Sequence, residues 1–147
     1  MIQRIQSIYY LIAMILVGLM TLWPLAQVGD ALIDINGNGT SGPDSPIPFP
    51  LSYIGYLIIF LCVICIWMYK DRKKQLILGR VNYFLLLAYI VVISLSIERV
   101  INTPEASSAV SYNVSIFLPL VALGFLFLAN RAVKKDEDLV RSLDRLR

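Results

Sequence analysis

The sequence predicts an all-α membrane protein, in which a four-helix transmembrane bundle carries a C-terminal cytoplasmic amphipathic helix. Apolar residues make up 58% of the 147 residues, and the mean hydropathy is +0.72, well above the usual values for a soluble protein. Four apolar runs are long enough to cross a bilayer. Helices are expected for all four, because lipid offers the backbone no hydrogen-bond partner and four strands cannot close a barrel.

The four predicted spans form one integral membrane domain over residues 1–147. The first run follows a positive charge, Arg4, as a signal peptide would. It is longer than a signal h-region, however, and Trp23-Pro24 closes it without a clear small-residue cleavage site, so we expect a retained anchor. The predicted spans are about 8–28, 51–69, 77–97 and 114–131, and a cytoplasmic tail covers 132–147.

Lysine and arginine are unevenly distributed among the connections between these spans. All except Arg99 lie before the first span, in the connection from Lys70 to Arg80, or at the end of the fourth span and in the tail. An excess of these residues in short loops marks the cytoplasmic face, so both termini should be cytoplasmic. The other two loops, 29–50 and 98–113, should lie outside. They are too short to bury a core, and we expect no outer domain.

Two motifs suggest chemistry, and each has a simpler explanation. Cys62-Val-Ile-Cys65 is a CxxC motif such as membrane thiol oxidoreductases use, but it lies inside a span and no second cysteine pair exists to relay electrons. We interpret it as two small residues on a packing face. The segment from Asp34 to Gly39 matches the first half of a calcium loop, but Ser45 replaces the bidentate glutamate. We therefore expect no metal and no cofactor.

The sequence also argues against an enzyme. It contains no histidine, which removes imidazole bases, Ser-His and Cys-His nucleophile pairs, and histidine metal ligands. No nucleophile, base and oxyanion set can be assembled from the spans. The expected protein is non-enzymatic.

Polar residues inside membrane spans usually mark a substrate or ion pathway, and here they are sparse. The span centres hold no Asp, Glu, Lys or Arg. Asn82, Ser94 and Ser96 are predicted to make hydrogen bonds between helices, and Pro119 is predicted to kink the fourth helix. The alternative function is a small transporter or channel, with its pore inside one chain or between the subunits of an oligomer. A water-filled cavity reaching Asn82 or Ser94 would favour it.

The tail is the one dense polar pattern. Leu139, Val140, Leu143 and Leu146 recur at helical spacing, which predicts an amphipathic helix continuing from the fourth span. Such a helix can rest among anionic lipid headgroups, or it can dock a protein. Its four acidic residues exceed what a lipid binder needs, and both interpretations stay open.

Both ends of the chain resemble a known family. The opening MIQRIQ and the closing stretch from Leu128 to Arg147, with Leu-Ala-Asn-Arg-Ala, Leu-Val-Arg-Ser and Asp-Arg-Leu-Arg, are similar to short four-span inner-membrane proteins of Gram-negative bacteria, grouped as a domain of unknown function. The middle matches in hydropathy. The resemblance implies a multi-pass location in the bacterial inner membrane, and it brings no activity, ligand or catalytic residue.

We therefore expect a membrane accessory or scaffold subunit. Its partners are the lipid bilayer and, at the tail, either anionic lipid headgroups or an unidentified protein; no nucleic-acid partner is expected. The candidate partner-binding residues are Asn130, Arg131, Arg141, Asp144 and Arg145.

Overall fold

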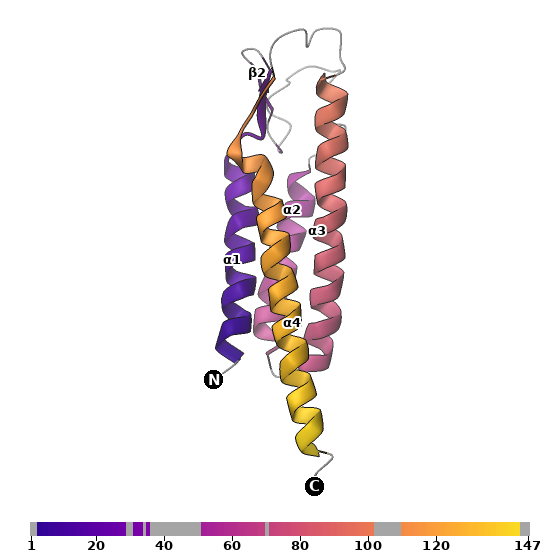
Figure 1. The fold of residues 1–147 in the computed structure, drawn as a ribbon. Helices are drawn as coiled ribbons and strands as arrows, with labels where there is room; N and C mark the ends of the chain where they lie inside the picture. The colour runs from indigo at the N-terminus through magenta and orange to yellow at the C-terminus, as the bar shows by residue number, and fades with distance from the viewer. Residues whose placement is uncertain are drawn as a thin grey trace.

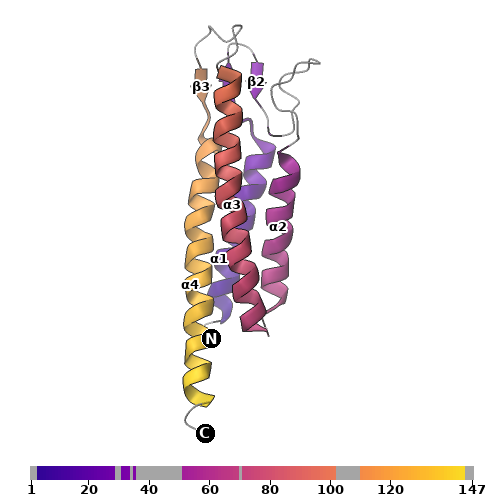
Figure 2. The same ribbon diagram turned by 90° about the vertical axis from the view of Figure 1, so that its right-hand side faces the viewer.

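The computed structural model describes residues 3–28, 31–33, 35, 51–69, 71–101 and 110–144. Within them the fold is helical apart from three short strands, and four long helices lie along one axis (Figures 1 and 2). The elements are α1 Gln3–Leu22, β1 Ala26–Val28, β2 Ala31–Ile33, α2 Ser52–Trp67, α3 Arg72–Ile101, β3 Val110–Tyr112, the 3-10 helix η1 Val114–Phe117 and α4 Leu118–Asp144.

The four helices close into a ring. α1 packs most extensively on α4, α1 and α3 each contact α2, and α4 also contacts α3. The strands lie at one end of the bundle, which we call the sheet end. The opposite end is the tail end, where α1 and α3 begin and α2 and α4 finish (Figure 1). Every helix therefore presents one side to the interior and another to the surroundings.

Three of the helices are long and apolar enough to cross a membrane, over Ile5–Leu22, Arg72–Glu98 and Val114–Ser142. The helix in the second predicted span, α2, is apolar but has only 16 residues. At 1.5 Å per residue it is about 24 Å long, shorter than a typical hydrocarbon core of about 30 Å. A span over 51–69 is therefore longer than the helix that the structure forms there.

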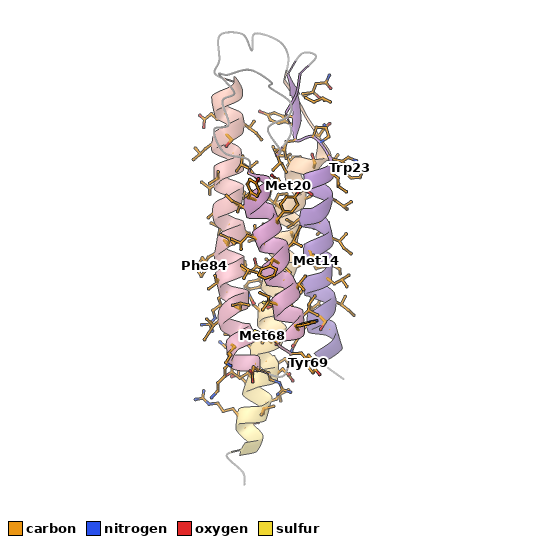
Figure 3. The ribbon with its side chains drawn as sticks, turned by 180° about the vertical axis from the view of Figure 1, so that it is seen from behind. Met14, Met20, Trp23, Met68, Tyr69 and Phe84 are labelled. Atoms are coloured by element: carbon orange, nitrogen blue, oxygen red, sulfur yellow. The ribbon has the colours of Figure 1, made fainter. Side chains whose placement is uncertain are left out.

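Large apolar side chains cover the outside of the bundle as well as its interior. Phe84 is 66% exposed, Phe60 60% and Leu120 52%, and Figure 3 shows such side chains projecting outward along the helices. A soluble protein of this size rarely exposes so continuous an apolar surface. The outer surface therefore suits a hydrocarbon environment.

The sheet end departs from the prediction. α1 ends at Leu22, and the chain enters β1, so the predicted first span to residue 28 is wrong at its end. β1 is the central strand and pairs antiparallel with β2 and β3, in the order β2-β1-β3. These segments thus form a small sheet that the sequence does not predict. The calcium-like segment 34–45 lies outside the described residues apart from Ile35.

The start of α4 explains why Pro119 does not kink the fourth helix. The side chains of Asn113 and Ser115 both donate hydrogen bonds to the Pro24 carbonyl oxygen, which ties η1 to the end of α1. α4 then begins at Leu118, so Pro119 lies in its first turn. A backbone N–H there has no helical partner to lose, and proline is tolerated. The predicted kink is replaced by a helix start.

Candidate functional site

Polar side chains gather inside the tail-end half of the bundle. We call this set the polar belt: Gln6 and Tyr10 of α1, Arg72, Gln75 and Asn82 of α3, and Asn130 and Asp136 of α4. Gln6, Gln75, Asn82 and Asp136 are 3%, 1%, 0% and 8% exposed, so water satisfies few of their polar atoms. Buried polar groups need internal partners, and the belt supplies most of them across helices.

Tyr10, Asn130 and Gly79 join three helices at one point. The Tyr10 hydroxyl donates a hydrogen bond of 3.0 Å to Asn130 Oδ1, and Asn130 Nδ2 donates one of 3.0 Å to the Gly79 carbonyl oxygen. A Cβ atom at Gly79 would collide with both Asn130 Oδ1 and the Tyr10 hydroxyl. Glycine is needed here because α3 approaches α1 and α4 too closely for a side chain.

Two glutamines bind backbone carbonyl groups of other helices. Gln6 Nε2 donates to the Ala132 oxygen at 3.1 Å, and Gln75 Nε2 donates to the Cys65 oxygen at 3.0 Å. Since α2 ends at Trp67, Cys65 has one of the last carbonyl groups without a helical partner. Gln75 thus caps the short helix α2 from the neighbouring helix.

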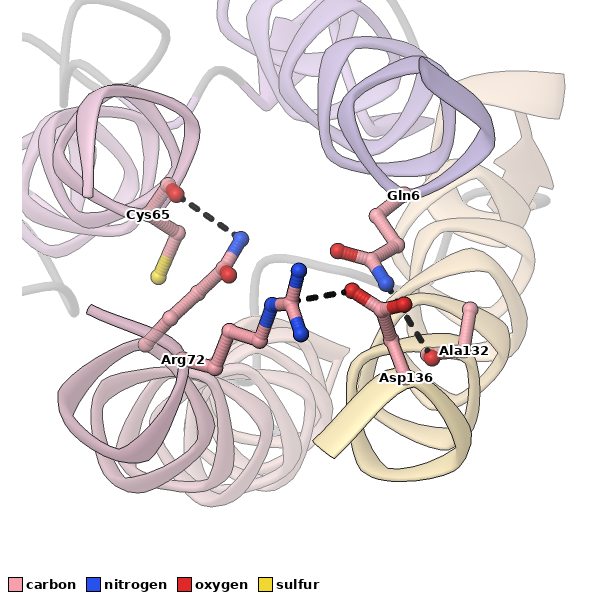
Figure 4. A network of polar contacts seen from close by, with 6 residues as sticks. Gln6, Cys65, Arg72, Ala132 and Asp136 are labelled. Atoms are coloured by element: carbon pink, nitrogen blue, oxygen red, sulfur yellow. Dashed lines mark hydrogen bonds and ion pairs between the residues drawn. The ribbon is translucent and has the colours of Figure 1, made fainter. Parts of the chain in front are cut away.

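One ion pair closes the belt at the tail end. Arg72 Nε lies 3.0 Å from Asp136 Oδ2, and their side chains are 24% and 11% exposed. Figure 4 shows Arg72 of α3 reaching Asp136 of α4, beside the bond from Gln6 to Ala132. The contact is ionic rather than an aligned hydrogen bond. An exposed pair, Lys74 with Asp71, lies nearby at 3.3 Å, with side chains 70% and 63% exposed.

The two cysteines are free, fully buried and part of the core. Cys62 Sγ accepts a hydrogen bond of 3.1 Å from Asn82 Nδ2. Asn82 therefore links α3 to α2, as predicted. Ser94 and Ser96 do not link helices, because each donates instead to a carbonyl oxygen four residues earlier on α3, Ile90 and Val92.

Two of the hollows in the structure bear on the channel hypothesis, which expects a cavity that reaches Asn82 or Ser94. An apolar groove of about 310 Å³ lies between α3 and the start of α4. Ser94 and Tyr112 supply the hydroxyl groups of its lining, beside Ile93 and Phe117. Asn82 does not line this groove. The second, of about 560 Å³, lies on α4 and is lined by Arg131, Lys134, Lys135, Asp138 and Leu139. Within the described residues, no group of three or more His, Cys, Asp or Glu side chains could hold a metal ion.

The predicted partner-binding residues do not form one cluster. Asn130 points into the bundle and holds Tyr10 and Gly79. Arg131 and Arg141 are exposed on α4, Asp144 is its last residue, and Arg145 lies outside the described residues.

Sequence reasoning missed most of the belt. A signal was available on α3, where Arg72, Gln75, Gly79 and Asn82 follow at intervals of three and four residues and so share one face. On α1, Gln6 and Tyr10 are likewise four apart. Nothing in the sequence indicates which face of α4 meets them.

This arrangement defines a class: a small helical protein with three helices able to cross a membrane and an internal polar belt that ties four helices together. The chain belongs to the family described as Domain of unknown function (DUF4293), whose model matches residues 2–146. No curated protein and no solved structure matches the chain.

Proposed function

We propose that this protein is a non-enzymatic accessory or scaffold subunit of the bacterial inner membrane, and that the end of α4 docks a cytoplasmic or membrane-embedded protein. In this proposal all four helices traverse the bilayer and both termini are cytoplasmic. The bilayer is thinner around α2, because this helix is short. The tail end is then the cytoplasmic end, where the basic residues gather.

The supporting observation is that α4 extends beyond the rest of the bundle (Figures 1 and 2). Within the described residues, Asp136 is the last α4 residue with a polar tie to another helix. The helix continues to Asp144, eight residues further, which adds about 12 Å at 1.5 Å per residue. A segment of this length presents two turns of helix to a partner.

The direction of this extension favours a protein over a lipid surface as its partner. A helix resting among headgroups must lie in the plane of the membrane, whereas α4 continues along the bundle axis (Figure 2). Leu139 and Val140 are 45% and 40% exposed on it, and Arg141 lies beside them. Exposed apolar side chains bordered by charge are typical of a helix that lies in a partner's groove.

The test is affinity purification in mild detergent with four forms of the protein. The full chain should retain a partner that both a chain ending at Glu137 and an Arg141→Glu, Arg145→Glu variant lose. Ending at Glu137 keeps Asp136 and its ion pair, so we expect the bundle to stay intact. A Lys73→Glu, Lys74→Glu variant reverses the same charge on α3 and should keep the partner. Retention of the partner by the α4 reversal variant would refute the proposal.

One observation favours the alternative, a small transporter or channel. Gln75 Oε1, Asn82 Oδ1 and the Tyr89 hydroxyl are buried without a hydrogen-bond partner among the described residues. Successive residues of this set are seven positions apart, so the three groups lie along one face of α3 over about 21 Å. A single file of water molecules, or a polar solute, would give these groups their missing hydrogen bonds.

This alternative has its own test. The protein reconstituted in liposomes with a pH-sensitive dye should dissipate a proton gradient, and Asn82→Leu should abolish the leak while Ser94→Ala, outside the file, should not. Liposomes that hold the gradient with the native protein would exclude proton conduction.

A further inference from the structure

The seam between α3 and α4 brings two arginines together near the tail end. The rings of Tyr83 and Phe127 pack across this seam, with centroids 6.5 Å apart. Arg80 is one turn from Tyr83 toward the tail end, and Arg131 is one turn from Phe127 in the same direction, because the two helices are antiparallel. The neighbouring contact from Asn130 to Gly79 fixes this register. Arg80 and Arg131 therefore flank the same point of the seam.

Neither arginine has an acidic partner in the described part of the chain. The ion pairs there join Arg72 to Asp136 and Lys74 to Asp71. Arg80 and Arg131 are exposed, so both positive charges are open to an anion bound at the seam, and each would attract it.

The surface along the seam changes character at these arginines. Toward the sheet end it is apolar, with Phe84 66% and Phe127 54% exposed. Toward the tail end, Arg131, Lys134, Lys135 and Asp138 line one hollow on α4. Along α4 the apolar surface at Phe127 is therefore followed by a cationic stretch that begins at Arg131.

We infer that the α3–α4 seam binds one anionic phospholipid, with its phosphate between Arg80 and Arg131 and its acyl chains along Phe84 and Phe127. The two arginines complement the charge of a phosphate, and the apolar surface one turn away suits acyl chains, which a soluble anion lacks. Arginine suits this role because its planar guanidinium binds phosphate oxygens in pairs. Lys134 and Lys135 add positive charge at the level of the headgroup. This site does not depend on the docking of a protein at the end of α4.

The experiment is native mass spectrometry of the full chain in detergent with added phosphatidylglycerol or phosphatidylcholine. The native protein should bind phosphatidylglycerol in preference to phosphatidylcholine. An Arg80→Gln, Arg131→Gln variant should bind phosphatidylglycerol with an affinity roughly tenfold lower or more. Each cation near a headgroup raises the binding constant by about fivefold. Each single variant should show a smaller loss. Because both side chains are exposed, the variants should fold normally.

The control is Lys74→Gln, Arg141→Gln, which removes two exposed positive charges of the same end away from the seam and should leave phosphatidylglycerol binding within twofold. Glycerol 3-phosphate, which has the phosphate without the chains, should not compete. Equal binding of phosphatidylcholine, full binding by the double arginine variant, or competition by glycerol 3-phosphate would each overturn the inference.

Discussion

Gly79 is the residue whose size matters most for the polar belt. We predict that Gly79→Ala destabilises the protein by about 1–3 kcal/mol, the usual cost of overpacking. The added methyl group would displace Asn130 and Tyr10 and weaken both of their hydrogen bonds. Thermal unfolding in detergent, followed by circular dichroism, measures the effect.

The matched control is Gly124→Ala, on α4. A Cβ atom there meets no atom within 4 Å, and alanine favours a helix over glycine by up to about 1 kcal/mol. This variant should be as stable as the native protein or slightly more stable. Equal destabilisation by both substitutions would mean that close approach at Gly79 is unimportant.

The Arg72–Asp136 pair should be energetically coupled. A double-mutant cycle with Arg72→Gln and Asp136→Asn should give a coupling free energy of about 1–3 kcal/mol, because both side chains are largely shielded from water. The same cycle at Lys74 and Asp71, whose side chains are mostly exposed, should give under about 1 kcal/mol. Unfolding by denaturant in micelles measures both, and equal coupling energies would contradict this account of the ion pair.

At the same scale, the sequence predicted only part of the belt. Asn82 stood out because it is an amide in an apolar run, and its bond to Cys62 confirms the predicted link between helices. From sequence, Asn130 is predicted to belong to a partner surface, because the dense polar pattern of the chain lies at the tail. Its true neighbours, Tyr10 and Gly79, are 120 and 51 residues away in sequence, and hydropathy does not encode such distant contacts.

Among the elements, α4 combines a packed part and a projecting part. We predict that a chain ending at Glu137 unfolds at the same temperature as the full chain, whereas one ending at Lys135 unfolds at a lower temperature. The two forms differ by Asp136 and Glu137, and only the longer form keeps Asp136 and its contact to Arg72. Thermal unfolding of the two forms, purified side by side, tests this boundary; equal losses would place the boundary further along α4.

Helix positions were largely predictable, because each apolar run contains or overlaps a helix. Helix ends were less so. α3 begins at Arg72 rather than near residue 77 because charged residues are good helix formers outside the apolar run. α4 continues beyond residue 131 to Asp144, as expected for a helix that runs from the fourth span into the tail.

The small sheet was not predictable from local pattern. Residues Ala26–Val28 are mostly apolar and continue the first run, so they resemble the end of a span. Their strand partners include Val110–Tyr112, and a pairing between such distant segments leaves no periodic signal. Pro24 has no backbone N–H to donate to a helical hydrogen bond, and it was the local indication that α1 ends early.

The whole molecule combines an apolar exterior with a polar interior at one end. Its outer side chains suit hydrocarbon, and its internal ties at the tail end fix the four helices relative to one another. Under the proposed scaffold role, the part of α4 beyond Asp136 is the segment that would contact a partner.

The most direct test of this account is photocrosslinking in cells, with a photoreactive amino acid in place of Leu139 on the projecting part of α4 or in place of Phe84 on the apolar exterior. We predict a discrete protein adduct from position 139 that is absent from position 84. No protein adduct at position 139, or the same adduct at both positions, would contradict the proposal that the end of α4 docks a partner.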